Sequence, residues 1–172
     1  MAIYALGSLE PTISGDAFVH PDCTIIGDVH IGAESSIWPQ AVLRGDEGPI
    51  FVGERTSIQD GSVLHTIASS PTTVGNNCTI GHIVHLEGCT IEDNALVGNG
   101  SIVLHRVIVR SWALVGANAV VTNDTEVPSG ALALGVPAKI RPDAASPELI
   151  RDSAEAYINR VETYRKNLRR ID

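Results

Sequence analysis

The segment TIGHIVHLEGCTI, residues 79–91, carries two histidines and a glutamate within six positions, and another histidine lies upstream. Imidazole and carboxylate side chains bind divalent cations and transfer protons. Two histidines with one glutamate form a known zinc set, and the same donors suit non-haem iron(II). The four candidate residues are His65, His82, His85 and Glu87. Whether they can meet depends on the elements that carry them.

Large aliphatic residues recur every six positions along most of the chain. A period of six fits neither an amphipathic helix, with its period of about 3.6, nor a simple strand, with its period of 2. It fits a solenoid whose coils of about 18 residues have three short flat faces. The register is clearest at Ile13, Val19, Ile25, Ile31, Ile37 and Leu43, and it resumes at Val52, Ile58 and Leu64. The pattern resembles the hexapeptide repeat of the left-handed parallel β-helix, so we predict an all-β solenoid.

A helix is predicted after the repeats. Ser146 supplies a capping hydroxyl and Pro147 suits the first helical position. Apolar residues from Ile150 to Leu168 then lie on one helical face, which is typical of a packing surface. We therefore expect a β-helix over residues 1–140 and a C-terminal α-helix over residues 146–170 that packs along the solenoid.

Composition excludes several classes of function. The formal net charge is −8 and the 12 Lys and Arg residues are scattered, which argues against a nucleic-acid partner. No apolar run approaches the roughly 18 residues of a membrane span, so we expect no membrane partner. The three cysteines cannot all pair with one another and no basic, apolar leader opens the sequence. These features favour a reduced, cytoplasmic setting.

The repeat register predicts how the candidate ligands are placed. His65 follows the inward Leu64 and Glu87 follows the inward Leu86, so the two polar side chains should point outward from one face. Equivalent positions in successive coils stack about 4.8 Å apart. His82 falls nearer a corner and would have to come from an adjacent copy of the chain. A site between subunits, with an open position for water, is what a catalytic divalent metal needs.

Two interruptions of the register, at 44–51 and 65–73, lie beside polar residues that the core does not explain. Solenoid cores are filled by their own side chains, so function is expected at such insertions or between subunits. The polar residues are Arg44, Asp46, Gln59, Asp60 and His65.

Four stretches, AVLRGD (41–46), IQDGSVLH (58–65), TIGH (79–82) and GVPAK (135–139), resemble the γ-class carbonic anhydrases and their wider hexapeptide family. The resemblance implies a homotrimer with metal at the subunit interfaces, held by three histidines. It also implies reversible hydration of carbon dioxide to bicarbonate, in which a metal-bound hydroxide attacks the substrate.

The family's ligands carry over incompletely. His65 and His82 match two of them, whereas Glu87 stands where the family has its third histidine. His85, two residues earlier, remains an alternative third ligand. We expect zinc, with iron(II) or cobalt as alternatives. An anionic ligand lowers the positive charge of the site, so bound water should be a weaker acid and the activity weak or altered.

The resemblance assigns roles to four other residues. The residue matching Gln59 hydrogen-bonds near the metal-bound water, and those matching Arg44 and Asp46 pair across the interface. Asp60 belongs to the same polar cluster, and we treat all four as catalytic candidates.

Two other functions stay open. One is a hexapeptide-repeat acyltransferase that uses acyl-CoA, with a histidine base beside a groove, so that the substrate would be a small acyl compound. The other is a trimeric scaffold whose site has decayed through the loss of the third histidine. Three further histidines, His20, His30 and His105, are expected at the surface without partners.

Overall fold

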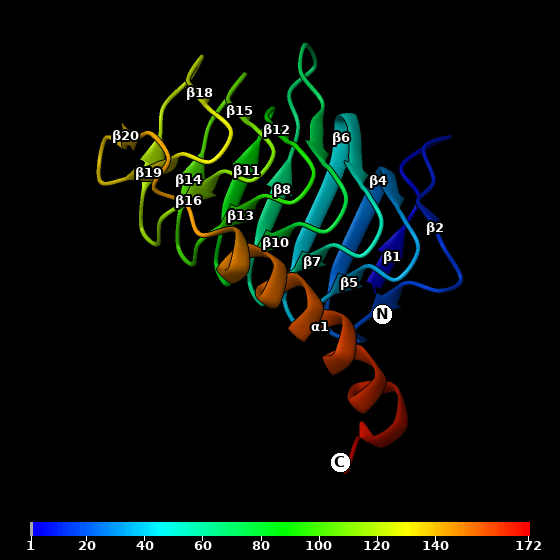
Figure 1. The fold of residues 1–172 in the computed structure, drawn as a ribbon. Coiled ribbons are helices and arrows are strands. Elements are labelled where there is room, and N and C mark those ends of the chain that lie inside the picture. Colours follow the sequence, from blue (N-terminus) through cyan, green and yellow to red (C-terminus); the bar gives the residue numbers. More distant parts are fainter. Residues whose placement is uncertain (1) are drawn as a thin grey trace.

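The computed structural model describes residues 2–172 and is a left-handed parallel β-helix with one C-terminal helix (Figure 1). Each coil contributes to three faces. The first face contains β1 (Ala2–Tyr4), β4 (Thr24–Ile31), β6 (Val42–Val52), β8 (Val63–His65), β11 (His85–Glu87), β14 (Ile102–Val103) and β17 (Val120–Val121). The predicted fold class is therefore confirmed.

The other two faces complete the triangle. The second face contains β2 (Thr12–Ile13), β9 (Thr72–Val74), β12 (Thr90–Ile91), β15 (Ile108–Val109) and β18 (Glu126–Val127), together with the carboxyl halves of β4 and β6. The third face contains β3 (Phe18–Val19), β5 (Ser36–Ile37), β7 (Ser57–Ile58), β10 (Thr79–Ile80), β13 (Leu96–Val97), β16 (Leu114–Val115), β19 (Leu132–Leu134) and the antiparallel β20 (Lys139–Arg141).

The core consists of aliphatic residues that stack on their equivalents in neighbouring coils. On the third face Ile58 pairs with Ile80, and Ile80 pairs with Val97. On the first face Leu64 pairs with Leu86 in the same way, and all five side chains are fully buried. Burial of one such side chain contributes about 1.5–3 kcal/mol, so the six-residue register is strongly held.

The first interruption of the register does not leave the solenoid. β6 runs through it as one strand of 11 residues that turns from the first face to the second. The second interruption forms a short loop closed by a bridge between Ile67 and Ser70. Both interruptions of the six-residue register lie directly beside His65, at the end of β8.

Helix α1 (Pro147–Asn167) begins as predicted, because the Ser146 hydroxyl accepts a hydrogen bond from the Leu149 amide. It lies along the third face, against β5, β7 and β10 (Figure 1). Its apolar side packs Val161, Tyr157 and Tyr164 against Phe18 and Trp38. Among the described residues, no helix combines the length and apolar character that a membrane crossing requires.

Some local expectations were wrong. Leu168 is half exposed and lies beyond the end of the helix. His20 is buried rather than superficial, and its Nδ1 accepts a hydrogen bond from the Asp22 amide. His30 has a partner, since its Nε2 lies 2.8 Å from Asp28 Oδ1. Cys89, for which the sequence predicts no role, lies in a shortened five-residue unit of the repeat and packs into the core.

Candidate functional site

His65 and Glu87 end the neighbouring strands β8 and β11 and occupy directly paired positions. Their side chains meet, with His65 Nδ1 2.9 Å from Glu87 Oε1. On the other side of the ring, His65 Nε2 lies 3.0 Å from Asp46 Oδ1, and Asp46 is paired with Arg44. The predicted side-by-side placement of His65 and Glu87 is therefore confirmed, and both imidazole nitrogens face carboxylates.

Glu87 has two further imidazoles around it. His85 Nε2 lies 3.2 Å from Glu87 Oε2, and His105 Nε2 lies 3.4 Å from the same oxygen. The hydrogen bond from His65, aided by that from His85 and by the nearby His105 against partial burial, lowers the pKa of Glu87 to about 2. The carboxylate is therefore ionised at neutral pH. We call Arg44, Asp46, His65, His85, Glu87 and His105 the carboxylate cluster.

Asp46 is also held as an anion. Partial burial by itself would raise the pKa of Asp46, but hydrogen bonds from Arg44, the backbone and His65 outweigh it and lower the pKa. An ionised Asp46 can accept a hydrogen bond from His65 Nε2–H and so fix the orientation of the ring. Carboxylates commonly orient metal-binding histidines in this way.

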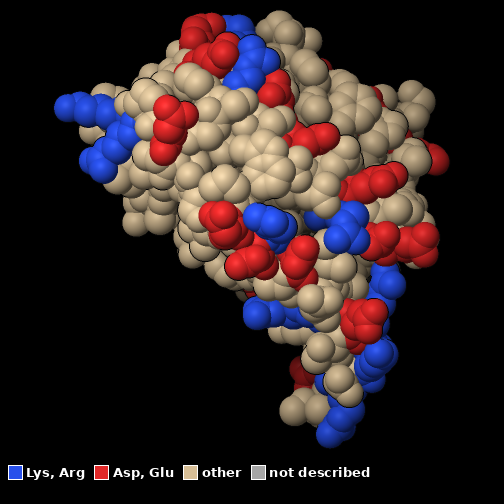
Figure 2. All heavy atoms as spheres, in the orientation of Figure 1, with Lys and Arg blue, Asp and Glu red and all other residues tan. Residues whose placement is uncertain are grey.

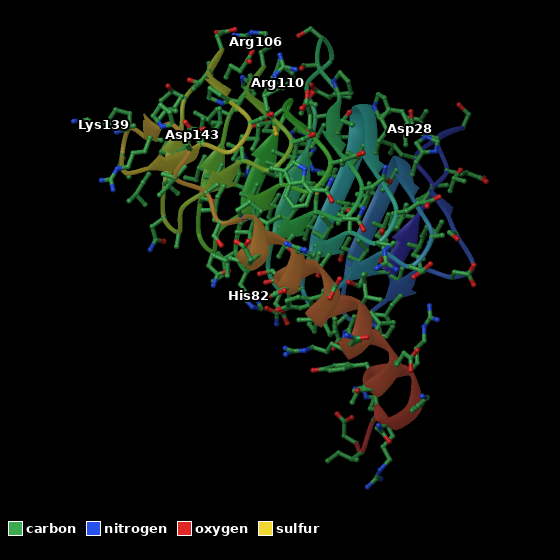
Figure 3. The ribbon with its side chains drawn as sticks, viewed as in Figure 1. Asp28, His82, Arg106, Arg110, Lys139 and Asp143 are labelled. Atoms are coloured by element: carbon green, nitrogen blue, oxygen red, sulfur yellow. The ribbon has the colours of Figure 1, made fainter. Side chains whose placement is uncertain are left out.

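His82 lies elsewhere, in the turn before β11, at the opposite corner of the first face from Glu87. Its Nδ1 lies 2.9 Å from Asp60 Oδ2, and its Nε2 lies 3.3 Å from the hydroxyl of Tyr157 on α1. Figure 3 shows His82 beside α1. A carboxylate at this distance favours a proton on Nδ1, which leaves the Nε2 lone pair on the side of Tyr157.

Gln59 completes this second group. It directly follows β7, is only 3% exposed and lines a crevice of about 310 Å³ together with His82 and Tyr157. Burial raises the pKa of Tyr157, so its hydroxyl remains protonated and can donate a hydrogen bond. We call Gln59, Asp60, His82 and Tyr157 the corner cluster.

The structure therefore divides the predicted site residues between two clusters. Arg44, Asp46, His65 and Glu87 are together, and Gln59, Asp60 and His82 are together, but the groups occupy different corners. Over residues 2–172, no three His, Cys, Asp or Glu side chains of one chain are arranged to hold a metal ion. The role of each residue as ligand or catalyst stays a prediction.

Two members of these clusters were missed by sequence reasoning. His105 was expected at the surface without a partner, yet it reaches Glu87. The available signal was that His105 lies one place beyond the residue that stacks on Glu87 in the next coil. Tyr157 was interpreted only as a packing residue of the helical stripe, and nothing in that stripe indicates its contact with His82.

On the face that Figure 2 shows, acidic and basic side chains are interspersed, so this face has no large patch of one charge. Arg110 pairs with both Glu92 and Glu126, and Arg106 pairs with Asp124. Figure 3 shows both arginines at the side of the solenoid opposite α1. These ion pairs connect successive coils.

Comparison with known proteins agrees with this architecture. A family model described as "Bacterial transferase hexapeptide (six repeats)" matches residues 10–45 and 88–123. The chain is 41% identical over 163 residues to "Gamma carbonic anhydrase 2, mitochondrial" of Arabidopsis thaliana, and the match covers 90% of this chain and 59% of that protein. The chain thus spans less than two thirds of the length of this relative.

A protein named "Carbonic anhydrase" from Geobacillus kaustophilus is 38% identical over 164 residues, which covers 95% of this chain and 85% of that protein. The crystal structure of a hexapeptide transferase family protein from Anaplasma phagocytophilum superposes with a TM-score of 0.91 at 38% identity. That match covers 95% of this chain and 98% of the other.

Fold and repeat together define a hexapeptide-repeat β-helix protein. Within that class, the chain belongs to the family of the γ-carbonic anhydrases and their hexapeptide relatives. Its relatives suggest a metal cofactor, small-molecule substrates and an oligomer.

Proposed function

We propose that this protein is a γ-carbonic-anhydrase-like metalloenzyme that interconverts carbon dioxide and bicarbonate at the interfaces of a homotrimer. The observation that carries the proposal is the contact between His65 and Glu87 on adjacent coils. These two side chains would form one wall of the site. His82 of the partner subunit would form the other.

The donor set fits a divalent cation. An imidazole nitrogen and an ionised carboxylate oxygen lie 2.9 Å apart, slightly closer than the roughly 3.3 Å between two tetrahedral ligands on one zinc ion, so a small movement would admit the ion. Asp46 faces Nε2 of His65, so it can accept a hydrogen bond from a protonated Nε2 while Nδ1 binds the cation. When no cation is bound, a hydrogen bond joins the same two atoms, His65 Nδ1 and Glu87 Oε1.

The corner cluster suits the third ligand equally well. Asp60 faces Nδ1 of His82, so Nε2 carries the lone pair that would bind the cation in place of its contact with the Tyr157 hydroxyl. Gln59 is buried beside it and would orient water or substrate with its amide. A divalent cation held by these residues would acidify a water molecule and so supply a nucleophile near neutral pH. We expect zinc, with iron(II) or cobalt as alternatives.

Exposed apolar side chains support an interface on the first face. Val63 on β8 and Ile102 on β14 are both exposed, and both lie in the row of outward positions that includes His85. Ile83, next to His82, is 72% exposed and has a φ of 58°. Large apolar residues grouped in this way mark interaction surfaces. A trimer that covered them would bring one subunit's corner cluster toward another's carboxylate cluster.

An acyltransferase is the second candidate, because the Anaplasma structure is described as a hexapeptide transferase family protein. His82 with Asp60 would serve as its general base. The described residues that line the crevice beside His82 include no Lys or Arg to bind the phosphates of an acyl-CoA. This composition favours the metalloenzyme.

Metal analysis and a carbon dioxide hydration assay on protein prepared with zinc test the proposal. We expect about one zinc ion per chain and hydration that a chelator removes. Protein without metal and without hydration would contradict it. Saturable binding of acyl-CoA by such a protein would favour the acyltransferase, and absence of both activities would favour a decayed scaffold.

A further inference from the structure

The crevice beside His82 is larger than carbon dioxide requires. It lies between α1 and the corner that follows β10 and β13, and its volume is about 310 Å³. That is room for about ten water molecules at ~30 Å³ each. The polar residues that line it are Gln59, Thr79, His82, Asn99, Ser153 and Tyr157. Its apolar part comes from Leu96 and Ala156.

Thr79 provides the sign that something binds there. Thr79 is one of the residues that line the crevice, it is 5% exposed, and its Oγ1, which is itself buried, has no hydrogen-bond partner in the part of the chain described. Buried hydroxyl groups are nearly always hydrogen-bonded, because water can no longer solvate them. A buried hydroxyl without a partner beside a crevice therefore favours a ligand whose polar group reaches it from the crevice.

Asn99 adds a second donor. Its Oδ1 accepts a hydrogen bond from the His82 amide at 3.0 Å, so the amide is oriented with Nδ2 available to donate. Ser153 on α1 instead directs its hydroxyl hydrogen to the Leu149 carbonyl at 2.7 Å. The side chains that line the crevice include no Asp, Glu, Lys or Arg within the described residues. Neutral donors beside aliphatic carbon suit a carbonyl oxygen attached to a short alkyl chain.

We propose that this crevice is a binding subsite for small uncharged carbonyl compounds, such as short-chain amides, esters or thioesters, with Thr79 and Asn99 as donors to the carbonyl oxygen. Leu96 and Ala156 would contact the alkyl group. This subsite proposal rests on the proposed function in one respect only. It places the carbonyl compound beside His82, the residue that would bind the metal ion in the proposed active site. It extends the substrate class of the site beyond carbon dioxide.

Butyramide is the probe, with butyrate as the charged analogue of the same size. Ligand-observed NMR titration of the full-length, zinc-loaded protein should show saturable binding of butyramide and binding of butyrate at least tenfold weaker. Thr79→Val keeps the shape and removes the hydroxyl, and it should weaken butyramide binding about fivefold, the worth of one hydrogen bond. Ala156→Leu should abolish binding by filling the crevice.

Asn159→Leu is the matched control, because it adds the same side chain to α1 outside the crevice. It should bind butyramide as the unchanged protein does. No saturable binding, equal binding of butyrate, or equal binding by Ala156→Leu and Asn159→Leu would each overturn the proposal.

The proposed function is judged separately on the same samples. Butyramide binding by protein that has neither zinc nor carbon dioxide hydration would support the subsite and overturn the metalloenzyme. Hydration without butyramide binding would support the metalloenzyme and overturn the subsite.

Discussion

The imidazole of His65 and the carboxylate of Glu87 face each other across paired positions of β8 and β11, 2.9 Å apart. The distance follows from the fold, since the inward Leu64 and Leu86 fix the register of both strands. Both groups lie on rigid strands rather than loops, so little conformational entropy is lost when a cation binds between them. This pair is therefore the part of the candidate site that is already assembled in one subunit.

Replacing Glu87 tests its role as a ligand. Glu87→Gln removes the negative charge while it preserves size, and we expect zinc affinity to fall by at least 10-fold to 100-fold. Glu87→His restores a three-histidine set and should keep the zinc and raise carbon dioxide hydration, because the site then has more positive charge. Zinc content after dialysis and stopped-flow hydration measure both.

Glu126→Gln is the control for Glu87→Gln, since Glu126 is an exposed carboxylate paired with Arg110 on another face. It should keep its zinc. The variant His85→Gln shows whether Glu87 or His85 is the third metal ligand. Loss of zinc in His85→Gln with retention in Glu87→Gln would show that His85 is the ligand.

Asp60 should act through His82. Its Oδ2 lies 2.9 Å from His82 Nδ1, so Asp60→Asn weakens the preference for a proton on that nitrogen. We expect zinc affinity to fall about 10-fold to 100-fold, as for other carboxylates that orient a metal-binding histidine. Competition with a chromogenic chelator measures the change. Unchanged affinity in Asp60→Asn would show that Asp60 does not position the ligand.

Thr79 and Thr56 should respond oppositely to substitution by valine. Thr79 Oγ1 has no hydrogen-bond partner among the described residues, so Thr79→Val should stabilise the ligand-free protein by up to ~1 kcal/mol. Thr56 Oγ1 donates to the Gly75 carbonyl at 2.7 Å and accepts from the Cys78 amide at 3.0 Å. Thr56→Val should therefore cost about 1–3 kcal/mol. Thermal unfolding compares the two, and a loss of stability in Thr79→Val would show that its hydroxyl is satisfied.

Alkaline pH should destabilise the fold through its buried thiols. Burial raises the pKa of Cys78 and of Cys89 to about 12, whereas an unfolded thiol has a pKa of about 8.5. Between these values the native state binds more protons than the unfolded state, so stability is complete below about pH 8.5 and falls as pH rises. At pH 10 we expect roughly 2 kcal/mol of loss for each thiol.

Urea unfolding at several pH values between 7 and 10 measures this loss. The Cys78→Ala, Cys89→Ala double variant should lose less stability over that range than the unchanged protein. Identical pH dependence in the two proteins would contradict the thiol account.

The sequence predicts the solenoid well because each repeat unit makes the same local choice, and errors in one unit do not propagate. The contact of His65 with Glu87 follows from that register alone. His105 was missed because the short unit that contains Cys89 shifts the register. Leu86 pairs with Val103, so His105 lies one place beyond the position opposite Glu87 and reaches it only through its side chain.

Tyr157 could not be predicted for a different reason. Helical periodicity identifies which side of α1 is apolar, but it does not fix where along the third face the helix docks. The T-shaped contacts of Trp38 with Tyr157 and Tyr164, at centroid distances of 5.4 Å and 4.9 Å, determine that position. Only with α1 docked there does the Tyr157 hydroxyl come within 3.3 Å of His82 Nε2.

Anomalous diffraction at the zinc absorption edge, from crystals of the zinc-loaded protein, tests the central claim most directly. The account predicts a trimer with one anomalous peak at each interface, within ligand distance of His65, Glu87 and His82 of the partner subunit. A monomer, or an assembly in which His82 of the partner subunit lies far from the pair and no peak appears beside it, would contradict the account.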